Sequence, residues 1–121
     1  MGVEATYGPQ DVAGRLVGEL RHWRLEDGHL VRDYPTANWK ASLMATMAVG
    51  HLAELAWHHP DLRVSWGGVQ VRLTTHSAGG ITDKDFALAA EIERLLTWRP
   101  TPDGPLEGTP ADPQWRYLLD E

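Results

Sequence analysis

The 121-residue sequence contains no cysteine. This absence excludes a disulfide framework, a thiolate zinc site and a nucleophilic cysteine. Basic side chains are also few, because 11 lysines and arginines stand against 17 aspartates and glutamates, a formal net charge of −6. Such a chain repels a phosphate backbone and has no basic stripe to offset the repulsion. We therefore expect no nucleic-acid partner.

Long apolar runs are missing as well. No segment approaches the ~20 uninterrupted apolar residues that a membrane-spanning helix needs. The opening "MGVEATYGPQ" has neither the basic nor the apolar region of a secretory signal. We therefore expect a cytoplasmic protein without a membrane partner. The length fits one domain with a modest core, and chains this short often gain stability by self-association, so we expect a homodimer or homotetramer.

Apolar periodicity predicts three helices and two hairpins. Asp27-Gly28 is typical of a two-residue hairpin turn, and Gly67-Gly68 is expected to make the second one. Thr82 with Asp85 forms a capping box at the start of the last helix. The helices are expected at 9–21, 37–57 and 83–96. The strands are expected at 22–26, 29–34, 62–66 and 69–75.

This order of elements predicts an α+β fold. Two hairpins and three amphipathic helices bury their apolar sides most simply in a two-layer sandwich, with a four-stranded antiparallel sheet covered by three helices on one face. Residues 1–96 form this domain. Residues 97–121 contain five of the chain's eight prolines and are expected to form an extended tail. Its apolar end, "QWRYLLDE", is expected to dock on the same chain or on a neighbouring one.

Three histidines lie at the ends of predicted elements. His58 and His59 follow the central helix just before Pro60, which disfavours helical geometry, and His76 ends the last strand. A histidine at a helix C-terminus is also stabilised by the helix dipole, and three histidines form a common zinc ligand set. The residues alone therefore leave a capping role, a metal site and an acid–base site open.

The spacing of these histidines relative to acidic and aromatic residues is more specific than the histidines alone. The pattern consists of Glu54, His58-His59-Pro60, Trp66, His76 and Asp85. It resembles the signature of the pterin-4a-carbinolamine dehydratases, also called 4a-hydroxytetrahydrobiopterin dehydratases. Upstream, "HWRLEDGHLVRDYPTANWK" at 22–40 is similar to that family's "L-x-R-x-F-x-F-x-x-F" segment. The resemblance covers roughly residues 20–96, leaving the tail outside it.

The chain departs from the family pattern at three aromatic positions. Tyr34 and Trp39 stand where phenylalanines are usual, and Trp57 occupies a position that is often polar or acidic. Because Trp57 adjoins the histidines, it bears on the shape of the pocket.

The resemblance implies a hydro-lyase that recycles a pterin cofactor beside an aromatic amino-acid hydroxylase. Dehydration of a 4a-hydroxytetrahydropterin needs one acid and one base but no metal or organic cofactor, and histidine suits both tasks at neutral pH. The implied catalytic residues are His58, His59 and His76. His58 and His76 are expected to transfer protons, and His59 to contact the substrate. The implied substrate-binding residues are Trp23, Glu54, Trp66, Thr75 and Asp85.

Several of these residues have a structural alternative. Glu54 either orients His58 or is an ordinary exposed helix acid. Trp23 either flanks the pocket or belongs to the core, and Asp85 is expected to cap its helix and so hold the turn that carries His76. The protein as a whole also has a non-catalytic alternative. Proteins similar to this family act as dimerisation partners of a transcription factor or as carboxysomal RuBisCO assembly factors.

Overall fold

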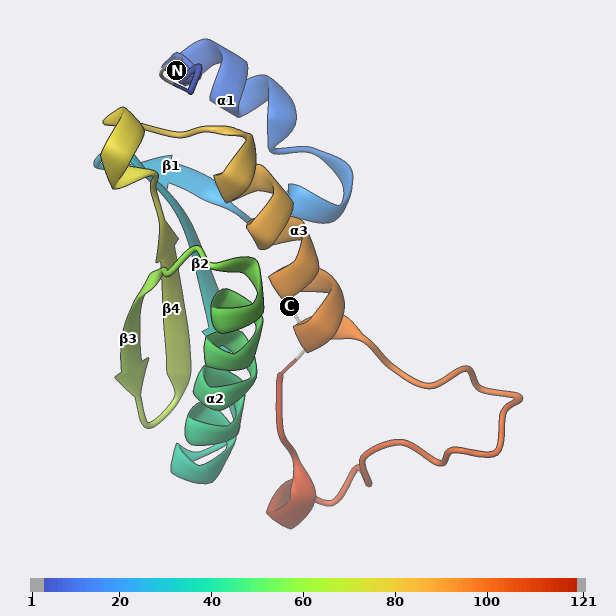
Figure 1. Ribbon diagram of the computed structural model, residues 1–121. Coiled ribbons are helices and arrows are strands. Elements are labelled where there is room, and N and C mark those ends of the chain that lie inside the picture. Colours follow the sequence, from blue (N-terminus) through green and yellow to red (C-terminus); the bar gives the residue numbers. More distant parts are fainter. Residues whose placement is uncertain (1–3, 120–121) are drawn as a thin grey trace.

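The structure is a computed structural model that describes residues 4–119 (Figure 1). Residues 1–3 of the expected domain and 120–121 of the expected tail lie outside the described part. The helices are α1 (Pro9–Arg15), α2 (Trp39–Ala56) and α3 (Asp83–Thr97), with short 3₁₀ helices η1 (Gly18–Leu20), η2 (His76–Ala78) and η3 (Pro113–Trp115). The strands are β1 (Arg24–Glu26), β2 (His29–Pro35), β3 (Asp61–Ser65) and β4 (Gly68–Leu73).

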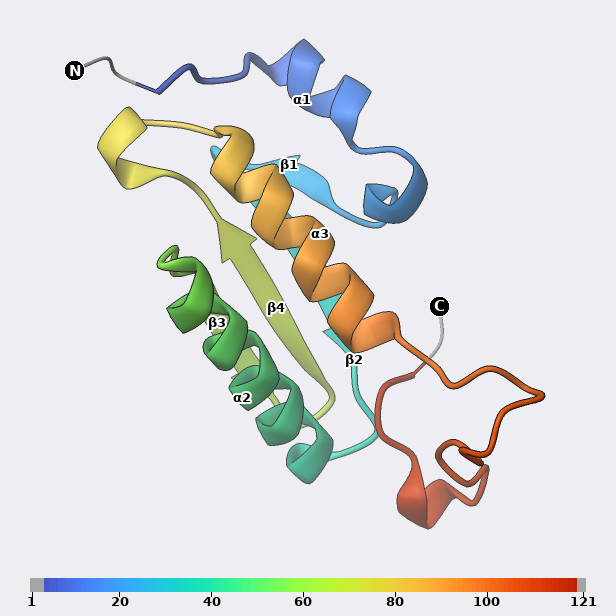
Figure 2. The same cartoon turned by 45° about the vertical axis from the view of Figure 1, so that its right-hand side comes forward.

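The strands form one antiparallel sheet in the order β1-β2-β4-β3. Helices α2 and α3 lie side by side over one face of this sheet, and α1 packs beyond the first turns of α3 (Figure 2). Val12 of α1 joins the same core as the other two helices. The predicted α+β sandwich of a four-stranded antiparallel sheet and three helices is confirmed.

Alternation along the strands decides which side chains enter this core. Leu30 and Tyr34 of β2 and Val69, Val71 and Leu73 of β4 point toward the helices and are almost fully buried. Each such side chain contributes about 1.5–3 kcal/mol when it leaves water. Arg32 shares this face, whereas Val31, Asp33, Gln70 and Arg72 alternate with these side chains and lie on the opposite face of the sheet. No helix of the described residues covers that face (Figure 1).

Several predicted boundaries differ from the structure. Strand β1 begins at Arg24 and not at residue 22, and β4 ends at Leu73, so that His76 lies beyond the strand and not at its end. The first helix was expected to reach residue 21, but α1 ends at Arg15, because Leu16 leaves helical geometry (φ −87°, ψ 60°). Gly18 then adopts a φ of 59°, which prevents the helix from resuming. The second hairpin turns one residue early, since Ser65 pairs with Gly68. The carbonyl of Trp66, which was expected in the strand, instead accepts a hydrogen bond from Ser42 (3.2 Å).

The long helix ends in a way the sequence pattern does not indicate. Its N-cap is Asn38, whose side chain accepts a hydrogen bond from the backbone N–H of Ala41 (2.9 Å). Its C-terminal end is set by Trp57, which adopts the left-handed conformation (φ 52°), and not by Pro60. The backbone therefore changes direction immediately before His58.

The tail returns to its own domain after a long exposed excursion. The backbone N–H of Ala37 donates to the carbonyl of Tyr117 (2.8 Å), and the N–H of Leu119 donates to the carbonyl of Pro35 (2.9 Å). Leu118, between these two bonds, packs on the core. Of the two predicted docking modes, the structure has the one on the same chain, at the N-terminal end of α2.

A buried carboxylate ties the sheet to α3. Glu93 is 6% exposed and accepts hydrogen bonds from the Trp23 indole (2.9 Å), the Tyr34 hydroxyl (2.8 Å) and the Arg32 guanidinium (3.0 and 3.2 Å). Burial by itself raises the pKa of Glu93. The hydrogen bonds from Arg32 and Tyr34, with the charge of Arg32, outweigh burial and bring this pKa below its ordinary value of 4.5.

Replacing Glu93 with alanine should cost about 3–5 kcal/mol in the free energy of unfolding, because it removes one partner of a buried ion pair. The matched control is Glu91→Ala, an exposed acid on the same helix that should remain close to wild type. Chemical denaturation measures both. Since the pKa of Glu93 is lower in the folded than in the unfolded protein, its contribution is fully present above the unfolded-state pKa and is lost as the pH falls toward the folded one. Equal stabilities of the two variants at pH 7 would contradict this account.

Candidate active site

The predicted histidines lie where the ends of three elements meet. The C-terminal end of α2 carries His58 and His59, the end of β4 leads through Thr75 to His76, and the first turn of α3 carries Asp85. All three ends lie at the same end of the domain, opposite the docking place of the tail (Figures 1 and 2).

Asp85 is the centre of this cluster. It is fully buried (0% exposed), and its Oδ2 accepts hydrogen bonds from the backbone N–H of Thr82 (2.9 Å) and from the hydroxyl of Thr75 (2.7 Å). Its Oδ1 lies 2.7 Å from Nε2 of His58. The predicted capping box of Thr82 and Asp85 is therefore present, and the same carboxylate also holds a histidine.

The hydrogen bonds around Asp85 determine which atom is the donor in each bond. Because the Thr75 hydroxyl donates to Asp85, the Thr82 hydroxyl, 2.8 Å away, donates to the oxygen of Thr75. An ionised carboxylate only accepts, so Nε2 of His58 carries the hydrogen in this bond. This leaves Nδ1 of His58 without a hydrogen-bonding partner among residues 4–119. The side chain is 14% exposed, so a ligand from solvent can reach part of the ring.

His59 has a different partner. Its Nε2 lies 2.7 Å from Oε1 of Glu54, and its ring packs edge-on against Trp57 with 5.0 Å between ring centroids. Both members of the His59–Glu54 pair are about half exposed or more (49% and 67%). Glu54 is thus an exposed helix acid that pairs with His59 and does not orient His58. The two adjacent histidines therefore point to different partners, His58 to the buried Asp85 and His59 to the exposed Glu54.

His76 begins η2, directly after the buried Thr75. Its side chain is exposed, and within the described residues it makes no hydrogen bond or ion pair. The turn beneath it is held by bonds between the backbone of Thr75 and that of Gly79 and Gly80 (3.0–3.4 Å). Thr75, expected to bind substrate, holds Asp85 in this structure.

Two predicted site residues lie elsewhere. Trp23 is a core side chain (3% exposed) bonded to Glu93, which is eight residues, or about 12 Å, beyond Asp85 on α3. Trp66 is in the hairpin turn at the opposite end of β4 from His76, about 25 Å away along the strand. Within one chain the structure brings neither tryptophan to the histidines.

The sequence pattern did not predict the hydrogen bond between Asp85 and His58, or that Thr82 helps to hold Asp85. The capping box was the feature of the sequence that could have indicated this bond. A capping aspartate uses one oxygen for its own helix, so its second oxygen needs a donor when the residue is buried. That requirement points to a nearby donor but does not identify it as His58.

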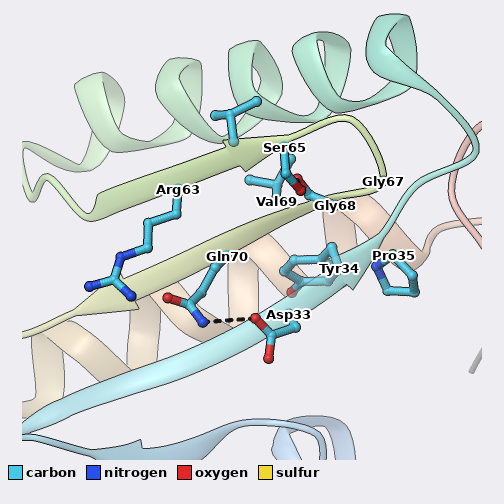
Figure 3. A pocket seen from close by; sticks show the side chains of 10 residues that line it. Asp33, Tyr34, Pro35, Arg63, Ser65, Gly67, Gly68, Val69 and Gln70 are labelled. Carbon is cyan, nitrogen blue, oxygen red and sulfur yellow. Dashed lines mark hydrogen bonds between the residues drawn. The ribbon is translucent and has the colours of Figure 1, made fainter.

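A second candidate site has fewer side chains suited to acid–base catalysis. A hollow of about 530 Å³ lies on the open face of the sheet, where Gln70 donates to Asp33 (2.9 Å) beside Arg63 (Figure 3). No histidine lines it. Among residues 4–119 no three acidic or histidine side chains are grouped so that they could hold a metal ion. Nor does this part of the chain include a helix that is both long and apolar enough to cross a membrane.

Comparison with known proteins identifies the family of this chain. Residues 6–95 match the family model described as pterin 4 alpha carbinolamine dehydratase. A protein of Aquifex aeolicus named "Putative pterin-4-alpha-carbinolamine dehydratase" is 43% identical over 82 residues, covering 68% of this chain and 83% of that protein. A protein of the same name from Haloarcula marismortui is 42% identical over 85 residues, covering 70% and 89%.

A solved structure supports the fold. The crystal structure of a transcriptional coactivator/pterin dehydratase from Brucella melitensis matches with a TM-score of 0.66, covering 75% of this chain and 98% of that chain at 21% identity. The matched range 6–95 contains His58, His76 and Asp85 and excludes the tail. On these matches the chain belongs to the pterin-4a-carbinolamine dehydratase family.

Proposed function

We propose that this protein converts a 4a-hydroxytetrahydropterin to the quinonoid dihydropterin by histidine acid–base catalysis, so that it recycles a pterin cofactor. The observation that carries the proposal is the His58–Asp85 pair. A buried carboxylate fixes one ring nitrogen of His58 at 2.7 Å and leaves the other available to a substrate. The same carboxylate accepts from Thr75, the residue directly before the exposed His76. Membership of the family supports the same reaction.

The reaction asks for two proton transfers. One group delivers a proton to the hydroxyl that leaves C4a as water, and another removes the proton from N5 as the new double bond forms. Positioned side chains of this kind contribute about 10²–10⁴-fold to a rate, and imidazole suits both because its two forms coexist near neutral pH. His58 and His76 form this pair in our proposal, and His59 contacts the substrate.

Asp85 prepares His58 for this task. It keeps the Nε2–H tautomer, so that Nδ1 is the nitrogen that meets the pterin. Thr75 and Thr82 hold Asp85 in turn through its other oxygen. The three side chains therefore act on the substrate through His58.

A non-catalytic role is the second candidate, and it is favoured by one observation. Several large apolar side chains on α2 are exposed, among them Met47 (76%) and Leu55 (72%), and Trp57 beside the histidines is exposed as well (77%). Such a surface suits a protein partner. A dehydration assay separates the two candidates, because a scaffold has no need of the reaction.

We expect His58→Ala and His76→Ala each to lower the dehydration rate at least about tenfold, as the loss of a positioned proton-transfer group does. His59→Ala should mainly raise KM. The measurement is stopped-flow absorbance on freshly generated 4a-hydroxytetrahydropterin. His51→Ala, an exposed histidine on the same helix, is the control and should keep the wild-type rate. Wild-type rates in both the His58 and the His76 variant would contradict the assignment of these two residues as the proton-transfer pair.

We further propose that the protein is a homodimer or homotetramer that buries the outer face of α2. Leu43, Met44 and Met47 lie on this face and are 42%, 49% and 76% exposed. Strand β3 is also an edge of the sheet, open to another strand.

Light scattering should therefore give two or four times the chain mass of 13.5 kDa. Met47→Glu places a charge in the proposed interface and should lower the mass, because an unpaired charge there is costly to bury. Val17→Glu, at an exposed apolar residue outside α2 (63%), should leave the mass unchanged. A monomeric wild type at micromolar concentration would refute the assembly.

The tail should be dispensable for catalysis. It docks at the N-terminal end of α2, about 27 Å along this 18-residue helix from the histidines. A chain ending at Leu96 should keep its dehydration rate and lose some thermal stability, since Tyr117 and Leu118 no longer cover the core. If it keeps its mass and melting temperature but loses activity, the tail instead serves the active site.

A further inference from the structure

The first described residues form an arm along the segment that leads into α3. The arm comprises residues 4–7 and precedes α1. The backbone N–H of Tyr7 donates to the carbonyl of Ile81 (2.9 Å). Thr6 lies so close to Gly80 that a Cβ on this glycine would meet its methyl group at 3.3 Å. The arm and the turn after His76 are therefore packed backbone against backbone.

Side chains extend this contact into the first turn of α3. The Tyr7 hydroxyl donates to the carboxylate of Asp83 and accepts from Arg15 (2.9 Å). The Tyr7 ring meets Phe86 edge-on at 5.0 Å, and Arg15 lies over the same Phe86 ring at 4.4 Å. Tyr7 thus contacts α3 through a hydrogen bond to Asp83 and a ring contact with Phe86, and it accepts a hydrogen bond from Arg15 of α1.

Glu4 adds an ion pair at the tip of the arm. Its carboxylate lies 2.6 Å from Nζ of Lys84. The hydrogen bond from Lys84 holds the pKa of Glu4 below its ordinary value, with smaller contributions from Thr82 and from charge on His58. The arm is therefore tied to both Asp83 and Lys84, the first two residues of α3.

Residues 82–85, which begin α3, make one set of contacts toward the protein interior and another toward the arm. Thr82 and Asp85 turn inward, are 1% and 0% exposed, and make the cluster that holds His58. Asp83 and Lys84 turn outward and are held by the arm. The preceding turn contains Gly79 in the left-handed region (φ 73°), which glycine adopts readily.

We propose that the arm, through Tyr7, is a positioning element of the active site. By fixing the first turn of α3 from outside, it sets where Asp85 lies and hence how the His58 ring is oriented. Tyr7 does not touch the substrate. The inference rests on the proposed dehydratase function, and it adds to that function a residue outside the histidine pattern.

The test compares the full-length wild type with Tyr7→Phe, which keeps the ring on Phe86 and removes the hydroxyl that bonds Asp83. Loss of the hydroxyl from this positioning contact should lower kcat roughly 3–10-fold while KM stays within about twofold. Tyr117→Phe, in the tail at the other end of α2, is the matched control and should keep the wild-type kcat.

Two further measurements separate positioning from folding. Asp83→Asn keeps an oxygen that accepts from Tyr7 and should retain kcat, whereas Asp83→Leu should lower it as Tyr7→Phe does. The ¹⁵N resonances of the His58 ring should shift or broaden in Tyr7→Phe and not in Tyr117→Phe. Unchanged kcat and unchanged His58 resonances in folded Tyr7→Phe would overturn the inference. If the wild type itself is inactive, the proposed function fails, and the His58 resonances alone then decide whether the arm positions the ring.

Discussion

A single buried carboxylate governs the arrangement of the histidine-bearing end of this protein. Asp85 is fully removed from water, and a buried charge is tolerated only when donors surround it. Its donors come from three separate elements: Thr82 at the start of α3, Thr75 at the end of β4 and His58 after α2. The need to satisfy one side chain therefore brings these three ends together and determines how His58 faces a ligand.

Helix α3 carries a second buried carboxylate, and comparing the two explains why only one belongs to a reactive site. Glu93 is bonded to Arg32, Tyr34 and Trp23 deep in the core. A guanidinium stays protonated at any ordinary pH, so the Arg32–Glu93 ion pair keeps its charges near neutrality and holds the sheet to the helix. Asp85 is paired with an imidazole, which can gain and lose a proton near neutrality. A buried carboxylate thus stabilises the fold at one position and orients a histidine ring at the other.

The sequence was informative wherever the structure depends on neighbouring residues. Asp27 and Gly28 both have positive φ, as the predicted turn requires, and Thr82 with Asp85 forms the predicted capping box. Prediction failed where distant parts of the chain decide. At the second hairpin, which turns early, Ser42 of α2 donates to the Trp66 carbonyl. The left-handed Trp57 is a local feature that the sequence pattern did not indicate. No local pattern contains the information that His58 meets an aspartate 27 residues later.

The central claim, that Asp85 fixes the protonation pattern of the His58 ring, is tested most directly by ¹⁵N NMR of the histidine side chains. In the wild type above the pH at which the ring is charged, His58 should carry its proton on Nε2 and show an unprotonated Nδ1. In Asp85→Asn this preference should weaken, because a neutral amide can donate as well as accept. A His58 ring protonated on Nδ1 in the wild type, or one with the same tautomer in both proteins, would contradict the account.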